Sequence, residues 1–106
     1  MTNKGRGKFS HHSLQQADKI GLTCGGLVSA WYRSTDWELS KSQKAYKFET
    51  YGMESVDDFY TYDDLTETLF TCHDRKDISI IITVTRINGN KKKINDFIKG
   101  THDDNR

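Results

Sequence analysis

The chain has 106 residues, which suffice for one domain and leave no room for a second hydrophobic core. Only 34% of the residues are hydrophobic and 29% are charged, yet the 11% aromatic content argues against a disordered chain. The formal net charge of +1 predicts no partner by itself. No apolar run approaches the roughly 20 residues that span a bilayer, so we expect a cytoplasmic protein that does not enter a membrane.

The charge changes sign along the chain, and this divides it into parts. Residues 1–10 contain two glycines and Lys4, Arg6 and Lys8, which predicts a flexible basic arm. We expect a single domain over residues 11–100 and a polar tail over residues 101–106. No Pro residue occurs.

The first half of the domain predicts one helix and two strands. Residues 13–20 are expected to form a short helix with Ser13 as its N-cap. Residues 27–33 and 44–51 alternate polar and apolar side chains, as half-buried strands do. In the link between them, Trp37 and Leu39 either fold back on the core, or Thr35 and Glu38 form the capping box of a helical turn.

Residues 55–72 carry conflicting signals. Leu65, Leu69 and Cys72 recur at helical spacing, so we expect a helix over residues 62–72 with a start as early as Ser55. The competing interpretation makes residues 68–72 a strand. The pattern leaves open whether the segment forms one helix, two helices or part of a strand.

The strongest pattern is the run of β-branched residues from 77 to 87, which predicts a central strand. Its even-numbered side (Ile78, Ile80, Ile82 and Val84) is expected to face the core. Residues 91–99 then predict a helix with Asn90 as its N-cap. Three strands with helices packed on one face give an α+β fold with a small antiparallel sheet, whose open edges would permit a homodimer.

The most distinctive chemical feature is an acidic segment interleaved with aromatic residues and free of Lys and Arg. On a rigid helix, spaced carboxylates can imitate phosphates, and tyrosines add contact area. We therefore predict a small non-enzymatic inhibitor, of the kind phages and mobile elements encode, that blocks a basic groove on a larger protein such as a defence nuclease. The alternative is an ordinary solvated helix start. The predicted protein-binding residues are Glu54, Asp57, Asp58, Tyr60, Tyr62, Asp63, Asp64 and Glu67.

A second hypothesis assigns the function to the basic residues. Lysines in the first turn of a helix oppose its dipole, and phosphate binding would give them a role. A small DNA- or RNA-binding protein is therefore the alternative. Its predicted contact residues are Lys4, Arg6, Lys8, Arg86, Lys91, Lys92 and Lys93.

The spacing of nucleophiles and metal ligands favours neither an enzyme nor a metal protein. His11, His12, Cys24, Cys72 and His73 could supply zinc ligands, but they lack the usual C-x₂₋₄-C and H-x₃₋₅-H spacing. Cys24 and Cys72 are expected to be reduced thiols, while their pairing depends on geometry that sequence does not fix. We expect no catalytic residues, metal or cofactor.

Overall fold

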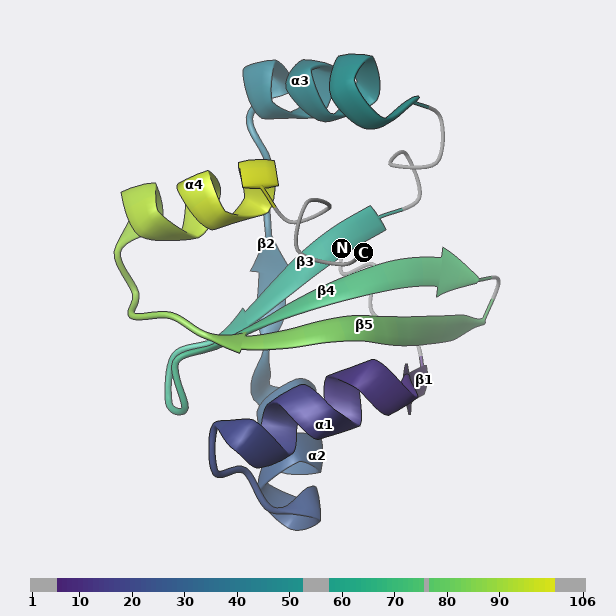
Figure 1. Ribbon diagram of the computed structural model, residues 1–106, viewed down its shortest axis with the longest axis vertical. Helices are drawn as coiled ribbons and strands as arrows, with labels where there is room; N and C mark the ends of the chain where they lie inside the picture. The colour runs from purple at the N-terminus through teal and green to yellow at the C-terminus, as the bar shows by residue number, and fades with distance from the viewer. Residues whose placement is uncertain (1–5, 53–57, 76, 101–106) are drawn as a thin grey trace.

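Two pairs of helices cover the opposite faces of a five-stranded sheet (Figure 1). The computed structural model describes residues 6–52, 58–75 and 77–100, and all structural statements refer to them. Helices α1 and α2 lie on one face, called the α1–α2 face, and α3 and α4 lie on the other, called the α3–α4 face. The elements are β1 (Arg6–Phe9), α1 (His11–Lys19), α2 (Cys24–Arg33), β2 (Thr35–Trp37), α3 (Lys41–Tyr51), β3 (Asp58–Asp63), β4 (Thr68–Arg75), β5 (Ile78–Arg86) and α4 (Lys91–Gly100).

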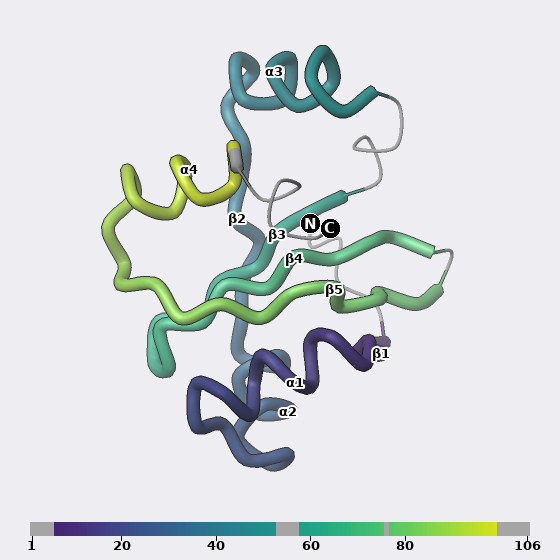
Figure 2. The backbone as a smooth tube through the Cα atoms, in the orientation of Figure 1, coloured from purple at the N-terminus to yellow at the C-terminus, as the bar shows by residue number. Residues whose placement is uncertain are grey.

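The sheet has the strand order β1-β5-β4-β3-β2. Strand β1 pairs with β5 in parallel, and the other neighbours are antiparallel. The backbone trace in Figure 2 shows β2 carrying the chain from α2 on one side of the sheet to α3 on the other. The α+β class is therefore confirmed. The prediction of about three antiparallel strands with helices on one face is wrong.

Strand β1 corrects the predicted flexible arm over residues 1–10. Residues 6–9 pair with residues 78–81 of β5, while residues 1–5, including Lys4, lie outside the described residues. Gly7 lies against the indole of Trp31, where an added Cβ would be 2.5 Å from Trp31 Nε1. A side chain at this position would therefore collide with the core, which explains why glycine stands there.

Helix α1 confirms the predicted N-terminal helix, but Ser10 rather than Ser13 is its N-cap. The Ser10 hydroxyl accepts a hydrogen bond from Ser13 N–H at 3.1 Å. The predicted strand over residues 27–33 is wrong, because this segment belongs to α2. Thr23 caps α2 through Gly26 N–H, and Leu27, Ala30 and Trp31 are buried at helical spacing.

Helix α3 replaces the strand predicted over residues 44–51. Ser40 and Gln43 form a capping box, which satisfies two backbone donors and starts a helix. The apparent alternation of aromatic and charged residues does not mark a buried face, since the residues α3 buries are Gln43 and Lys47. In the preceding link, Trp37 and Leu39 fold back on the core, and the alternative of a helical turn is wrong.

Strands β3 and β4 form a hairpin, so the helix predicted over residues 62–72 is wrong. Residues 64–67 form the turn, and Leu65, which supplied part of the helical pattern, is exposed in it. The competing interpretation of residues 68–72 as a strand is correct. Residues 53–57 lie outside the described part of the chain, so any earlier start near Ser55 does too.

Strand β5 confirms the predicted central strand, but its inner face was only partly predicted, since Val84 is buried in the core and Ile78 is exposed. Thr71 pairs with Thr83 and Cys72 with Ile81, so Ile82 is the extra residue of a bulge. The bulge reverses the alternation, so Ile81 and Val84 both face α1 and α2. Gln16 of α1 accepts a hydrogen bond from Val84 N–H at 2.8 Å and so pairs this backbone donor.

Two hydrophobic cores result, one on each face. On the α1–α2 face, Trp31 packs edge-on against Phe70 with ring centroids 5.5 Å apart. On the α3–α4 face, Ile94 and Ile98 of α4 pack against β3 and β4. Helix α4 therefore confirms the predicted C-terminal helix, and Asn90 caps it by accepting from Lys93 N–H at 3.2 Å.

Candidate nucleic-acid interface

The acidic segment does not present one outward surface. Tyr60 and Tyr62 are buried on the α3–α4 face, where the Tyr62 hydroxyl donates to Ile87 O at 2.7 Å. Asp63 is buried on the opposite face. Of the predicted residues, Asp64 and Glu67 are exposed in the hairpin turn. Glu54 and Asp57 lie outside the described residues. The strand alternation of β3 thus disperses a group that a helix would have displayed together.

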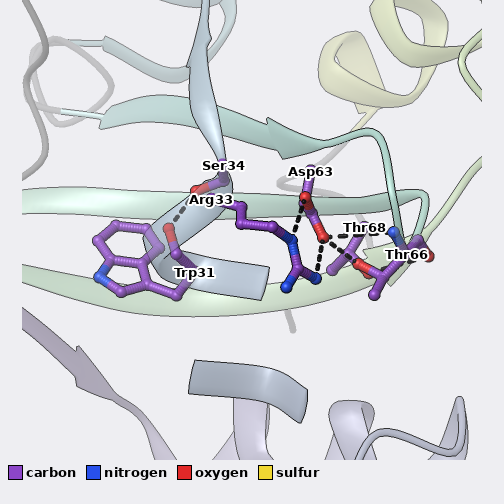
Figure 3. A network of polar contacts seen from close by, with 6 residues as sticks. All are labelled: Trp31, Arg33, Ser34, Asp63, Thr66 and Thr68. Carbon is purple, nitrogen blue, oxygen red and sulfur yellow. Dashed lines mark hydrogen bonds and ion pairs between the residues drawn. The ribbon is translucent and has the colours of Figure 1, made fainter. Parts of the chain in front are cut away.

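Asp63 is used within the protein, where it ties α2 to the β3–β4 hairpin (Figure 3). Its carboxylate accepts from Arg33 Nε at 3.2 Å and from Arg33 Nη2 at 3.0 Å, and from the Thr66 hydroxyl at 2.6 Å. Burial alone would raise the pKa of Asp63. The hydrogen bonds from Arg33 and Thr66 outweigh it, so the pKa lies below its ordinary value.

Asp58 and Lys47 form a second buried polar cluster on the α3–α4 face. The Asp58 carboxylate pairs with His73 Nδ1 of β4, and its side chain is almost fully buried. Lys47 of α3 is only 3% exposed, and its amine donates to Ile98 O at 3.2 Å. Burial lowers the pKa of Lys47, and the nearby Asp58 carboxylate opposes that shift. Lys47 therefore joins α3 to α4, and its amine also lies 5.2 Å from the ring centroid of Tyr60 in β3.

Of the predicted basic residues that the structure describes, all but Arg86 lie on the α3–α4 side of the sheet. In β1, Phe9 packs into the α1–α2 core and Gly7 meets Trp31. Because strand side chains alternate, Arg6 and Lys8 lie on the α3–α4 face. Arg86 shares the α1–α2 face with Val84. Lys91, Lys92 and Lys93 are exposed in the first turn of α4.

Helices α3 and α4 give their side of the sheet a strong positive charge. Together they carry seven lysines against two acids, Glu49 and Asp96. Helices α1 and α2 on the other side carry two cations, Lys19 and Arg33, against one acid, Asp18. The seven lysines are Lys41, Lys44, Lys47, Lys91, Lys92, Lys93 and Lys99, and all but Lys47 are exposed.

Helix α3 exposes both cations and aromatic rings. Tyr46 and Phe48 are exposed, Phe48 by 48% of its surface. A pocket of about 490 Å³ lies beside Phe48, and its lining residues include Leu39, Lys44 and Asp58 of β3. Exposed aromatic rings next to lysines can stack on bases while the lysines contact phosphates.

A second hollow, of about 760 Å³, lies between the first turn of α3 and the outer side of α4. Leu39 borders both hollows, so they adjoin. Lys92 donates to Asp96 at 2.8 Å, and this bond is the main cause that raises the pKa of Lys92. The residues lining this groove are Glu38, Leu39, Ser40, Ser42, Gln43, Lys91, Lys92, Asn95, Asp96 and Lys99.

The sequence interpretation missed the contribution of α3. Lys44 and the two exposed aromatic rings belong to the strand that the sequence predicted over residues 44–51, and Lys41 belongs to the link before it. The Ser40–Gln43 capping box was the signal that could have identified the helix. Lys99, in the last turn of α4, is not among the contact residues predicted from the sequence.

Comparison with known proteins gave no relative: no protein family, no curated protein and no solved structure matched this chain. Within the described ranges, no helix is long and apolar enough to cross a membrane. The same residues contain no group of three or more His, Cys, Asp or Glu side chains placed to hold a metal ion. Cys24 is exposed and Cys72 is buried, and neither forms a disulfide within the described residues.

Proposed function

We propose that the protein binds nucleic acid through the α3–α4 side of its sheet. The observation that carries the proposal is the separation of charge between the two helical layers. Seven lysines and two acids lie on α3 and α4, whereas α1 and α2 are nearly neutral. Such segregation in a chain of net charge +1 focuses a positive potential on one side.

The physical basis is contact between lysines and backbone phosphates. Each contact releases condensed counterions, so affinity would be strong at low salt and fall steeply as salt is added. Arg6 and Lys8 extend the positive charge across the sheet to its β1 edge. Phe48 and Tyr46 would add base stacking, which favours a single strand over a duplex. The proposal is for a binding function, with no catalytic step.

Fluorescence anisotropy with labelled oligonucleotides tests this proposal. Single-stranded DNA, single-stranded RNA and duplex DNA would each be titrated with protein at low salt. The informative variant is Lys44→Ala with Lys91→Ala, one lysine from each helix. The matched control is Lys19→Ala with Arg86→Ala, which removes the same charge from the opposite side.

We expect the wild type to bind at least one oligonucleotide. The Lys44/Lys91 variant should bind about tenfold more weakly, because each lost phosphate contact lowers the affinity severalfold. The control variant should bind within about twofold of the wild type. Absence of binding at low salt would contradict the proposal. An equal loss of affinity in both variants would mean that binding is non-specific charge attraction. That result would contradict the assignment of binding to the α3–α4 side.

Inhibition of a larger protein remains the second candidate, and it is favoured by the β3–β4 turn. There Leu65 is 75% exposed between the exposed acids Asp64 and Glu67. An apolar side chain flanked by carboxylates is a reasonable anchor for a basic groove. Capture of a host nuclease from lysate, lost when Leu65 becomes Ser and Asp64 becomes Asn, would support this candidate; capture unchanged by these substitutions would contradict it.

A homodimer stays a prediction. Both edge strands are short, since β1 has four residues and β2 has three. Short edges offer little backbone for pairing with a second copy. Light scattering at increasing protein concentration would test it, and a constant monomeric mass would contradict it.

A further inference from the structure

The groove between α3 and α4 has an unusual set of hydrogen-bonding groups. Gln43 is only 7% exposed and lines the groove. Its Oε1 accepts the Ser40 N–H at 2.9 Å in the capping box. This bond fixes the orientation of the amide. The Nε2 group has no hydrogen-bond partner among the described residues. It is therefore a donor that can bind a ligand, although the side chain that carries it is nearly buried.

Asn95 of α4 repeats this arrangement from the other wall. Its Oδ1 accepts the indole N–H of Trp37 at 2.9 Å, which leaves Nδ2 as the available group. In both amides the acceptor is used by the fold and the donor is left over. The groove thus offers N–H groups from two elements that are fixed by structural hydrogen bonds.

The charges around these amides also favour a negatively charged ligand. Lys91 and Lys99 contribute exposed ammonium groups, and the α3 N-terminus adds a partial positive charge. Of the two carboxylates at the groove, Asp96 is engaged by Lys92, while Glu38 is exposed in the link before α3. Hydrogen-bond donors therefore outnumber acceptors among the groups that line this groove.

We infer that this groove is a phosphate-binding subsite. A phosphate group has only acceptor oxygens and a negative charge, so it matches amide donors and ammonium groups at once. The inference rests on the proposed nucleic-acid function and deepens it, since it names the groove as the place where one backbone phosphate is held. Gln43 and Asn95 position that phosphate, and Lys91 and Lys99 neutralise it.

The structure offers nearly isosteric variants that remove the donors and keep the fold. Gln43→Glu retains an oxygen for the Ser40 N–H, and glutamate is a common partner in a capping box. Asn95→Asp retains an oxygen for the Trp37 indole. The matched control is Gln15→Glu with Gln16→Glu on α1, where the Gln16 oxygen also accepts a backbone N–H. Both double variants change the net charge equally.

Two measurements test the subsite. In ¹⁵N-labelled wild-type protein, the side-chain amide signals of Gln43 and Asn95 should shift saturably with inorganic phosphate, and not with sodium chloride at equal ionic strength. In the oligonucleotide titration, the Gln43/Asn95 variant should bind at least about tenfold more weakly, as expected for losing hydrogen bonds to a charged group. The α1 control should remain within about threefold of the wild type.

The outcomes separate the subsite from the function. Phosphate-dependent shifts without any oligonucleotide binding would support the subsite and overturn the proposed function. Oligonucleotide binding that the Gln43/Asn95 variant leaves intact would overturn the subsite and preserve the function. Amide signals that do not respond to phosphate would also overturn the subsite. Gln43→Glu alone serves as the second variant if Asn95→Asp disturbs the fold.

Discussion

The ion pair between Arg33 and Asp63 makes the strongest prediction about stability. Asp63 is 3% exposed and accepts from Arg33 and from Thr66, whereas the Arg33 side chain is 40% exposed. Breaking a fully buried pair costs about 3–5 kcal/mol. Because Arg33 is partly solvated, we discount this and expect about 2 kcal/mol for Arg33→Ala. Asp63→Ala also removes the Thr66 bonds, so we expect about 3 kcal/mol.

A double-mutant cycle measured by urea unfolding isolates the pair. We expect a coupling free energy of about 1–2 kcal/mol at pH 7. The folded pKa of Asp63 is lowered from its ordinary 3.8, so its contribution is fully present above that pH. It should disappear as the pH falls through the folded pKa. The exposed pair Lys92–Asp96 is the control and should couple more weakly. Coupling below about 0.5 kcal/mol at pH 7 would refute the reasoning.

Two further substitutions test the packing. Gly7→Ala should destabilise the protein by about 1–3 kcal/mol in urea unfolding, because the new Cβ would lie 2.5 Å from Trp31 Nε1. Gly25→Ala, which meets nothing within 4 Å, is the control and should not destabilise; equal effects of the two would contradict the close approach. Lys47→Met should change the free energy of unfolding by less than about 1 kcal/mol at pH 7, since removing a desolvated charge offsets the lost hydrogen bond. Because burial lowers the folded pKa of Lys47, the wild type should gain stability relative to this variant as the pH rises toward 10.5; a falling difference would contradict that assignment.

The segments that sequence predicted correctly are those whose local chemistry and burial agree. The β-branched run of β5 has both strand propensity and a buried position. Helix α4 combines the Asn90 cap with a stripe that buries Ile94 and Ile98. In these elements the pattern that favours the local structure is also the pattern that the core uses.

Two of the failures come from elements whose burial is unusual. Helix α3 buries Gln43 and Lys47 and exposes Phe48, so its hydrophobic pattern indicates no helical face. The β3–β4 hairpin places Leu65 in its turn and thereby breaks the apparent helical spacing. The local sequence pattern does not determine which neighbouring strand or helix will cover a residue in the fold.

The candidate site could be predicted only in part for the same reason. The basic residues of β1 and α4 were visible as charge clusters. Their position on one side of the sheet depends on the parallel pairing of β1 with β5, which is a long-range contact. The acidic segment was equally visible, but Asp63 pairs with Arg33 and Asp58 pairs with His73 inside the protein. Composition indicates which charges exist, and only the fold decides which ones remain exposed.

The most direct test of the account is the salt dependence of oligonucleotide affinity for the wild type and the Lys44/Lys91 variant. The logarithm of the association constant should fall linearly with the logarithm of salt concentration. If both lysines contact phosphates, the slope should be shallower in the variant by about 0.7 for each lost contact on a single strand. The Lys19/Arg86 variant should keep the wild-type slope. Identical slopes for all three proteins would contradict the assignment of binding to the α3–α4 side.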